Sequence, residues 1–258
     1  MPRLTIFNSY VLISMNTNKV GLLSDVHGNL QALESVLKDL DSREVRRLAC
    51  LGDVVGYGGH PNECLDLVRT RCRYSIYGNH EMALLRNEIA AGYRLEIRNS
   101  LEFHKSKLSA RNLNYIGSLP LSIDDPNFTA THGSLHNPTE FEYVFTEHDA
   151  DRHFAKQKKR IAFCAHTHAP GIWMQKNGRT TFTEAKDIYL NNSGKYLIDV
   201  GSAGQPRDGD ARACYVIFDP AEERVEFFRI SYDVRDAAEA VLQCGGSPSF
   251  ASRLFLGR

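Results

Sequence analysis

Short apolar runs alternate with helical patterns along most of this chain. The runs at 20–24, 47–51, 74–77, 128–131 and 161–165 are four to five residues long and end at polar residues or glycine, which is typical of buried strands. Between the first two runs, the segment 29–40 places leucine and valine at helical spacing, at Leu30, Leu33, Val36, Leu37 and Leu40. The alternation predicts an α/β fold.

The pattern continues to the end of the chain. Pro61 suits the first turn of a helix that extends to about residue 71, and a helical pattern covers 81–118, either as a cap over a site or as an outer-layer helix. A helix at 233–243 ends before Gly245. Short strands are predicted at 121–123, and a second sheet is predicted from the runs 171–175, 180–183, 196–200, 213–218 and 225–231. We expect one domain over 15–258, built from two mixed β-sheets packed face to face with helices on the outside.

Five of the predicted strands end in carboxylate, amide or imidazole side chains. Asp25 and His27 are two residues apart, so an extended chain points both to the same side, and Gly28 lets the chain turn away. The later runs end in Asp53, in Asn79 and His80, in His132, and in His166 and His168. The ends of such strands line a common crevice in an α/β sheet. One pair of this kind is common in turns, but five in order indicate a metal site.

The ordered set resembles the calcineurin-like metallophosphoesterase superfamily, whose pattern is Asp-x-His, Gly-Asp, Gly-Asn-His, His and Gly-His-x-His. The matching blocks here are Asp25-Val-His27, Gly52-Asp53, Gly78-Asn79-His80, His132 and Ala165-His166-Thr-His168. One departure is Ala165, where glycine is usual. The segment from Leu197 is similar to the closing strands and helix of a subgroup of small prokaryotic phosphodiesterases, some of which are labelled diadenosine tetraphosphatases.

The resemblance implies two divalent metal ions and a role for each ligand. A hydroxide that bridges the ions would attack phosphorus, and His80 would protonate the leaving oxygen as general acid. Nitrogen and oxygen donors without cysteine fit manganese, iron, zinc or nickel, and the oxygens favour manganese or iron. In the family, the first ion is held by the residues that correspond to Asp25, His27 and His168, and the second by those that correspond to Asn79, His132 and His166, with Asp53 as the bridge.

Asn79 is also expected to help bind the substrate. Two divalent ions, the two carboxylates and one hydroxide leave a net charge of about +1, which attracts a phosphate. An aspartate in place of Asn79 would cancel that charge. The neutral amide therefore favours substrate binding because it adds no negative charge to the site.

A second departure bears on the substrate. Protein Ser/Thr phosphatases carry Gly-Asp-x-x-Asp-Arg-Gly, whereas this chain has Gly52-Asp-Val-Val-Gly-Tyr-Gly58. Gly56 and Tyr57 replace the aspartate that orients the catalytic histidine and the arginine that holds the phosphate. We therefore expect a phosphodiesterase, with a dinucleoside polyphosphate hydrolase or a phosphoprotein phosphatase as alternatives. A non-catalytic interaction scaffold is the alternative of another class, although such members usually lose ligands and none is missing here.

Arg207 is the candidate substrate contact of the later sequence. It lies in the loop Gly201-Ser-Ala-Gly-Gln-Pro-Arg-Asp208, after an apolar run that ends at Val200. A guanidinium group can bind a phosphoryl group through two parallel hydrogen bonds. The alternative is that Arg207 pairs with Asp208 or Asp210 and only stiffens the loop.

The composition limits which kinds of partner and which compartment we expect. Lys and Arg number 31, as do Asp and Glu, so nothing favours a nucleic acid or a membrane, and we expect a small phosphoester or nucleotide-like substrate. Six scattered cysteines without a Cys-x-x-Cys pair favour a reduced, cytoplasmic setting. Residues 1–14 lack a signal-cleavage pattern and are expected to be an N-terminal extension outside the fold. No apolar run reaches the roughly 18 residues of a membrane span.

Overall fold

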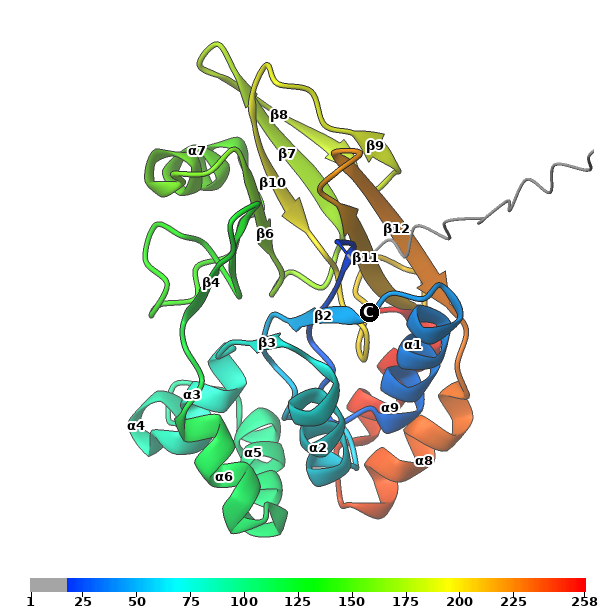
Figure 1. The fold of residues 1–258 in the computed structure, drawn as a ribbon. Helices are drawn as coiled ribbons and strands as arrows, with labels where there is room; N and C mark the ends of the chain where they lie inside the picture. The colour runs from blue at the N-terminus through cyan, green and yellow to red at the C-terminus, as the bar shows by residue number, and fades with distance from the viewer. Residues whose placement is uncertain (1–17) are drawn as a thin grey trace, which may run out of the picture.

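Two six-stranded sheets form the centre of the computed structural model, which describes residues 18–258 (Figure 1). The first sheet has the order β3 (Tyr74–Ser75), β2 (Arg47–Cys50), β1 (Val20–Leu23), β11 (Ala213–Asp219), β12 (Arg224–Ile230) and β9 (Ile188–Tyr189). The second has the order β4 (Ser122–Asp124), β5 (Thr129–Thr131), β6 (Ile161–Cys164), β10 (Lys195–Asp199), β7 (Gly171–Lys176) and β8 (Arg179–Glu184). The expected extension 1–14 lies outside the described residues.

Both sheets are mixed, as predicted. The strands β1, β2 and β3 run parallel, while β11 is antiparallel to β1, with Val20 opposite Phe218. In the second sheet β6 is parallel to β5 and β10, and β10 is antiparallel to β7. The ligand-bearing strands β1, β2, β5 and β6 therefore belong to the parallel parts of the two sheets.

The grouping of the late strands was predicted wrongly. The runs 213–218 and 225–231 do not join the second sheet, because β11 pairs with β1 and carries β12 into the first sheet. Apolar periodicity shows that a segment is a strand and which face is buried, but it carries no information about the neighbouring strand. The short strand β9 and the helix α9 (Pro248–Leu256) were not predicted.

The main core lies between the two sheets. Val20 and Leu22 of β1 face this layer, together with Phe128, Phe163 and Phe218, whose rings meet edge-on or tilted at 5.3–6.1 Å. Burial of such side chains contributes about 1.5–3 kcal/mol each. The sheets thereby hold the ends of β1, β2, β5 and β6 in fixed positions.

Helices cover both outer faces. The helices α1 (Leu30–Ser42) and α2 (Pro61–Arg71) pack their leucines and valines on the first sheet, and α8 (Val234–Gln243) contacts α1. On the second sheet, α7 (Glu147–Lys156) places Phe154 in a cluster with Trp173 and Leu197. The helix–sheet–sheet–helix architecture confirms the predicted fold class.

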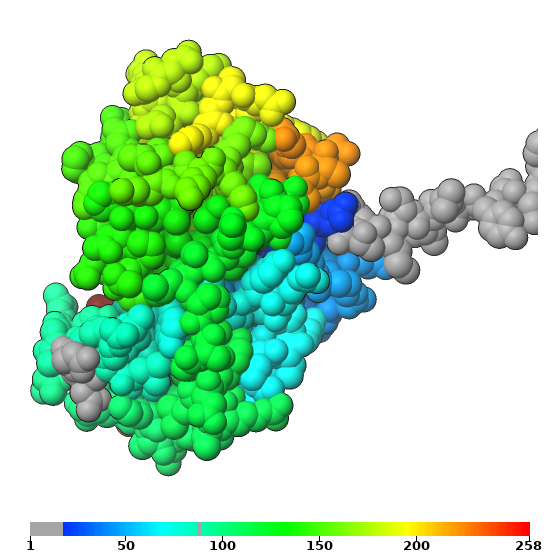
Figure 2. Space-filling model, turned by 60° about the vertical axis from the view of Figure 1, so that its left-hand side comes forward, coloured from blue at the N-terminus to red at the C-terminus, as the bar shows by residue number. Residues whose placement is uncertain are grey.

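The predicted helical segment forms four helices at one end of the first sheet. They are α3 (Asn79–Leu85), α4 (Asn87–Ala90), α5 (Leu95–Lys107) and α6 (Ala110–Gly117). Figure 2 shows this segment, coloured cyan to green, below the second sheet. Leu101, Leu108 and Ile116 join the same apolar cluster as α1 and α2, so the segment is packed into the main fold.

Two further observations concern the cysteines and the length of the helices. The six cysteines are unpaired, and four of them are buried. Across residues 18–258, no helix has both the length and the apolar character needed to cross a bilayer.

Candidate metal centre

The seven predicted ligands converge where the parallel strands end. Asp25, His27 and His168 form one group, and Asp53, His132 and His166 form another, with the ligand atoms of each group within 4.8 Å of one another. Asp53 Oδ2 lies 3.8 Å from His27 Nε2 and 3.4 Å from His132 Nε2. Asn79 completes the second group, because its Oδ1 is 3.0 Å from His132 Nε2. Asp53 therefore stands between the two groups.

In the first group, the Nε2 atoms of two histidines face each other. His27 Nδ1 bonds to the carbonyl of Val55 at 2.9 Å, and His168 Nδ1 bonds to the carbonyl of Gln205 at 2.6 Å. A carbonyl only accepts, so each Nδ1 carries a proton, and the lone pair of a neutral ring then lies on Nε2. These two Nε2 atoms are 3.3 Å apart. Two lone pairs at this distance repel unless a cation lies between them, so the pair fits a metal ion.

The second group repeats this arrangement. His132 Nδ1 bonds to the carbonyl of Leu51 at 2.8 Å, which leaves Nε2 directed at the Asn79 oxygen. The Asn79 amide is oriented by its Nδ2, which donates to the hydroxyl of Tyr93 at 2.8 Å. In a neutral ring an acceptor would meet an acceptor at this contact, so the contact requires a cation, either a proton on Nε2 or a metal ion. Such fixing of the far ring nitrogen is the usual outer support of metal-bound histidine.

The charges of the side chains at the site also favour the binding of a cation. Burial lowers the pKa of His132, but the Asp53 carboxylate more than offsets it and raises that pKa to about 10. Burial likewise raises the pKa of Asp25, yet the neighbouring His168 holds it well below its usual range. The carboxylates thus stay ionised and attract positive charge, whether as a proton or as a metal ion.

Five of the predicted ligands have left-handed backbone conformations. Their φ angles are 52° at Asp25, 50° at His27, 52° at Asp53, 73° at His166 and 59° at His168. Such conformations cost a non-glycine residue about 1–3 kcal/mol and persist where surrounding structure enforces them. They turn the chain sharply after each strand, so that side chains from different strands meet.

Glu81 enforces the turn at Asp53 and was missed by the sequence analysis. Its buried carboxylate accepts the backbone N–H groups of Asp53 at 2.8 Å, Val54 at 2.7 Å, Val55 at 3.1 Å and Gly78 at 2.9 Å. The available signal was its position in the first turn of the helix after Gly78, where glutamate caps a helix. Glu81 binds the loop after β2 to the start of α3.

Asp199 supports the His166–His168 loop and was also missed. The residue is buried at the end of β10, and its carboxylate accepts the Thr167 hydroxyl at 2.7 Å and the Gly201 N–H at 2.9 Å. Burial raises the pKa of Asp199 to about 7. Since Thr167 lies between two ligands, this contact joins their loop to the loop that carries Arg207.

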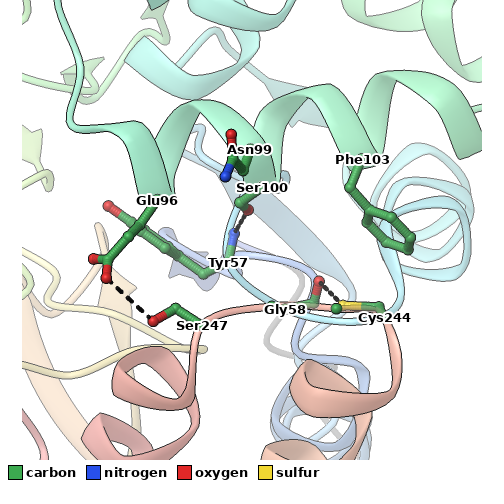
Figure 3. Close-up of a pocket in the computed structure, with 10 residues that line it drawn as sticks. Tyr57, Gly58, Glu96, Asn99, Ser100, Phe103, Cys244 and Ser247 are labelled. Carbon is green, nitrogen blue, oxygen red and sulfur yellow. Dashed lines mark hydrogen bonds between the residues drawn. The ribbon is translucent and has the colours of Figure 1, made fainter.

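The loop Gly56–Gly58 is held by α5 (Figure 3). Tyr57 N–H donates to Ser100 Oγ at 2.6 Å, which Figure 3 shows as a dashed line. Gly56 N–H donates to His104 Nδ1 at 2.8 Å, and His104 Nε2 donates to the Gly58 carbonyl at 2.7 Å. A Cβ at Gly56 would lie 2.1 Å from His80 Nδ1. An aspartate, the phosphatase residue at this position, therefore cannot occupy it without a shift of His80 or the loop.

His80 lies beside Asp53 without an orienting carboxylate on its far nitrogen. The backbone N–H of His80 donates to Asp53 Oδ1 at 2.9 Å. In the ring, Nε2 lies 3.9 Å from Asp53 Oδ2, and Nδ1 has no hydrogen-bond partner among residues 18–258. The ring packs against those of His27 and Tyr57, at centroid distances of 4.7 and 4.8 Å. Burial lowers the pKa of His80 to about 4, so the resting imidazole is neutral at pH 7.

Arg207 is directed toward the site. Its side chain donates to Gln205 Oε1 at 3.0 Å, and its guanidinium lies 5.9 Å from the ring centroid of Tyr57. Burial raises the pKa of Tyr57 and Tyr143, and the charge of Arg207 opposes this at both phenols. The alternative pairing was wrong, because Asp208 and Asp210 pair with other arginines, Arg229 and Arg212.

Comparisons with known proteins agree with this geometry. Residues 19–223 match the calcineurin-like phosphoesterase superfamily domain. The uncharacterized protein MJ0912 of Methanocaldococcus jannaschii is 34% identical over 248 residues, which cover 95% of this chain and 100% of that protein. A crystal structure of a metallophosphoesterase from Sphaerobacter thermophilus superposes with a TM-score of 0.82 at 34% identity, over 93% of this chain and 99% of the other.

A more distant structure shows the same fold. The hypothetical protein PH1004 from Pyrococcus horikoshii OT3 has a TM-score of 0.76 at 17% identity, over 93% of this chain and 98% of its own. The chain belongs to the calcineurin-like phosphoesterase superfamily, and it is a phosphoester hydrolase. The predicted family is confirmed, and the His and Asp clusters needed to hold metal ions are present.

Proposed function

We propose that this protein is a phosphodiesterase with two divalent metal ions. The observation that carries the proposal is the pair of contacts that require a cation, between His27 Nε2 and His168 Nε2 at 3.3 Å and between His132 Nε2 and Asn79 Oδ1 at 3.0 Å. Asp25, His27 and His168 would hold one ion, Asn79, His132 and His166 the other, and Asp53 both. Manganese or iron suits this mixture of nitrogen and oxygen donors. Two such ions supply a nucleophilic water of lowered pKa and positive charge at the phosphoryl oxygens.

The chain's own residues bind the phosphate and move the proton. Arg207 contacts a phosphoryl oxygen, and Asn79 keeps the second group free of an additional negative charge. His80 donates a proton to the leaving oxygen. Burial lowers the pKa of His80, but the charge of Asp53 raises it, and a bound anionic phosphate acts in the same direction as Asp53. Substrate binding thereby brings His80 closer to its working protonation state.

The loop Gly56–Gly58 favours a diester over a protein monoester. A diester carries one negative charge, whereas a monoester dianion needs more positive charge around it. Tyr57 supplies no guanidinium, and Gly56 has no room for the aspartate of the Ser/Thr phosphatases. Arg207 is then the cationic side chain offered to the phosphate.

A hydrolysis panel with manganese tests this function. The substrates are bis(4-nitrophenyl) phosphate, 4-nitrophenyl phosphate, a dinucleoside polyphosphate and a phosphopeptide, each with a metal-stripped control. We expect the diester to have the highest kcat/KM. A phosphopeptide turned over faster than every diester would overturn the preference.

We also infer a cytoplasmic location. The six cysteines are unpaired, including the partly accessible Cys72 and Cys244, and free thiols persist where the compartment is reducing. Fractionation of the native cells with a cytoplasmic marker tests this. Recovery with a periplasmic or membrane fraction would contradict it.

A further inference from the structure

A cavity of about 700 Å³ opens beside the second group of ligands. One wall comes from α3 and α4 and from Tyr93, and the opposite wall comes from residues 139–143. Asn79 and His166 line it, so the cavity and the metal centre share two residues. Ligand cavities for small molecules typically measure about 300–1,000 Å³. A molecule whose phosphate lies at the metal centre can therefore extend directly into this space.

The shared residues are tied to two tyrosines of the cavity. The Tyr93 hydroxyl accepts from Asn79 Nδ2 at 2.8 Å, and the Tyr143 ring stacks on His166 with centroids 3.9 Å apart and planes 10° apart. Tyr143 is 43% exposed, so part of its phenol remains available to a bound molecule. The cavity walls are thus positioned by the same contacts that position the ligands.

The remaining walls combine apolar surface with charged groups. Met82, Ile89 and Phe141 supply apolar contact, while Arg86 and Glu140 are exposed and carry opposite charges on the two walls. A nucleobase is apolar on its faces and carries donors and acceptors along its edge, which matches such a lining. An acyl chain would use the apolar walls alone and would place Arg86 and Glu140 against methylene groups.

We propose that this cavity binds the base of a nucleotide ester whose phosphate lies at the metal centre. The inference rests on the proposed phosphodiesterase function and names its substrate class. The metal centre then provides the phosphate contact common to all substrates. The cavity provides the discrimination between nucleotide esters and simple alkyl esters.

Inhibition by monophosphates tests the proposal without a choice of natural substrate. The probes are adenosine 5′-monophosphate, methyl phosphate and octyl phosphate, each as a competitor of bis(4-nitrophenyl) phosphate hydrolysis by the manganese-loaded protein. Direct titration calorimetry of the same three compounds gives their affinities independently of turnover. We expect adenosine 5′-monophosphate to bind at least tenfold more tightly than either alkyl phosphate.

Two substitutions fill the cavity from opposite walls. Ile89→Trp and Thr139→Trp place an indole in the space, and Thr139 is exposed, so the second variant keeps the core unchanged. Each should remove the tenfold preference for the adenosine compound while the affinity for methyl phosphate stays the same. Leu95→Trp is the matched control, because Leu95 is 65% exposed in the same helical segment and does not line the cavity.

The two proposals fail in different ways. Equal affinities for the three monophosphates, tighter binding of octyl phosphate, or a preference that survives both tryptophan variants would overturn the cavity assignment. Absence of phosphodiester hydrolysis, with the calorimetric preference and its loss in both variants intact, would overturn the proposed function and leave the base-binding cavity in place.

Discussion

The carboxylate of Glu81 accepts the backbone N–H of Asp53 at 2.8 Å, and this contact fixes the carboxylate that stands between the two groups of ligands. Three further backbone N–H groups bond to the same side chain. An amide has only one accepting oxygen and would turn its NH2 group toward two of these donors. Glu81 is therefore a support for Asp53 that glutamine cannot replace.

We predict that Glu81→Gln lowers metal affinity or activity by about 10–100-fold, which is the usual effect of removing an outer support of a metal site. The two donors that lose their acceptor should also lower the free energy of unfolding by about 1–3 kcal/mol each. Metal content, kcat/KM and urea unfolding check both effects. Glu102→Gln on the exposed face of α5 is the control, and equal behaviour of the two variants would contradict the assignment.

Activity should depend strictly on divalent metal. Chelator-treated protein is expected to be inactive and to recover with manganese, since the side chains gathered at the centre are of the kinds that hold a metal ion. Asp53→Asn should be among the most damaging substitutions, because Asp53 contacts both groups. Full activity after metal removal, verified by elemental analysis, would rule out the metal mechanism.

His80→Ala should reduce turnover and leave metal content nearly unchanged, because His80 is not among the proposed ligands and its backbone N–H, which the substitution keeps, donates to Asp53 Oδ1. Loss of a general acid typically costs about 10²–10⁴-fold. The loss should be smaller for 4-nitrophenyl esters than for alkyl esters, since nitrophenolate leaves without a proton. Equal losses for both leaving groups would remove His80 from this role.

Arg207→Ala should raise KM for a phosphodiester with little change in melting temperature. The guanidinium bonds within the chain to the neighbouring Gln205, while the nearby acidic residues pair elsewhere. Kinetics on bis(4-nitrophenyl) phosphate and a phosphopeptide, with Arg212→Ala as the control on the same segment, measure the effect. Unchanged kinetics with a lowered melting temperature would assign Arg207 to structure.

Acid should destabilise the protein through His153, which lies in α7 away from the metal centre. Burial, assisted by the charge of Lys195, lowers the pKa of His153 to about 3, and its Nδ1 accepts the Leu135 N–H at 3.0 Å. Between pH 6.5 and 3 the unfolded chain binds a proton here that the native state does not bind. The full free energy of unfolding is therefore present above pH 6.5, and the part that depends on His153 falls as the pH drops below that value.

At pH 5 the cost from His153 is about 2 kcal/mol relative to pH 7. We expect His153→Asn to lose correspondingly less stability between these two pH values than the wild-type protein. Urea unfolding in the presence of a chelator measures the difference, because the metal-site histidines then titrate alike in both proteins. His148→Asn, exposed on the same helix, should retain the full pH sensitivity, and an identical result for both variants would contradict the prediction.

The position of the candidate site could be predicted because its chemistry is local to each strand. Asp25, Asp53 and His132 each follow a short apolar run, and the parallel ends of such strands meet in any sheet of this class. The helix with Leu33 and Leu37 could be predicted for a similar reason, since its apolar spacing lies within one segment. The resemblance to the family implies a role for each predicted ligand without knowledge of their distances.

The tertiary structure decided whatever depends on segments distant in the sequence. The pairing of β11 with β1, the direction of Arg207 and the cavity between Tyr93 and Tyr143 all join parts of the chain that local periodicity treats separately. A strand's apolar pattern specifies its buried face but not its neighbour, and an arginine pairs with whichever charges the packed chain brings near it. The sequence by itself therefore determined which groups are the candidates to act on a phosphate ester, and the packing of distant segments determined what surrounds those groups.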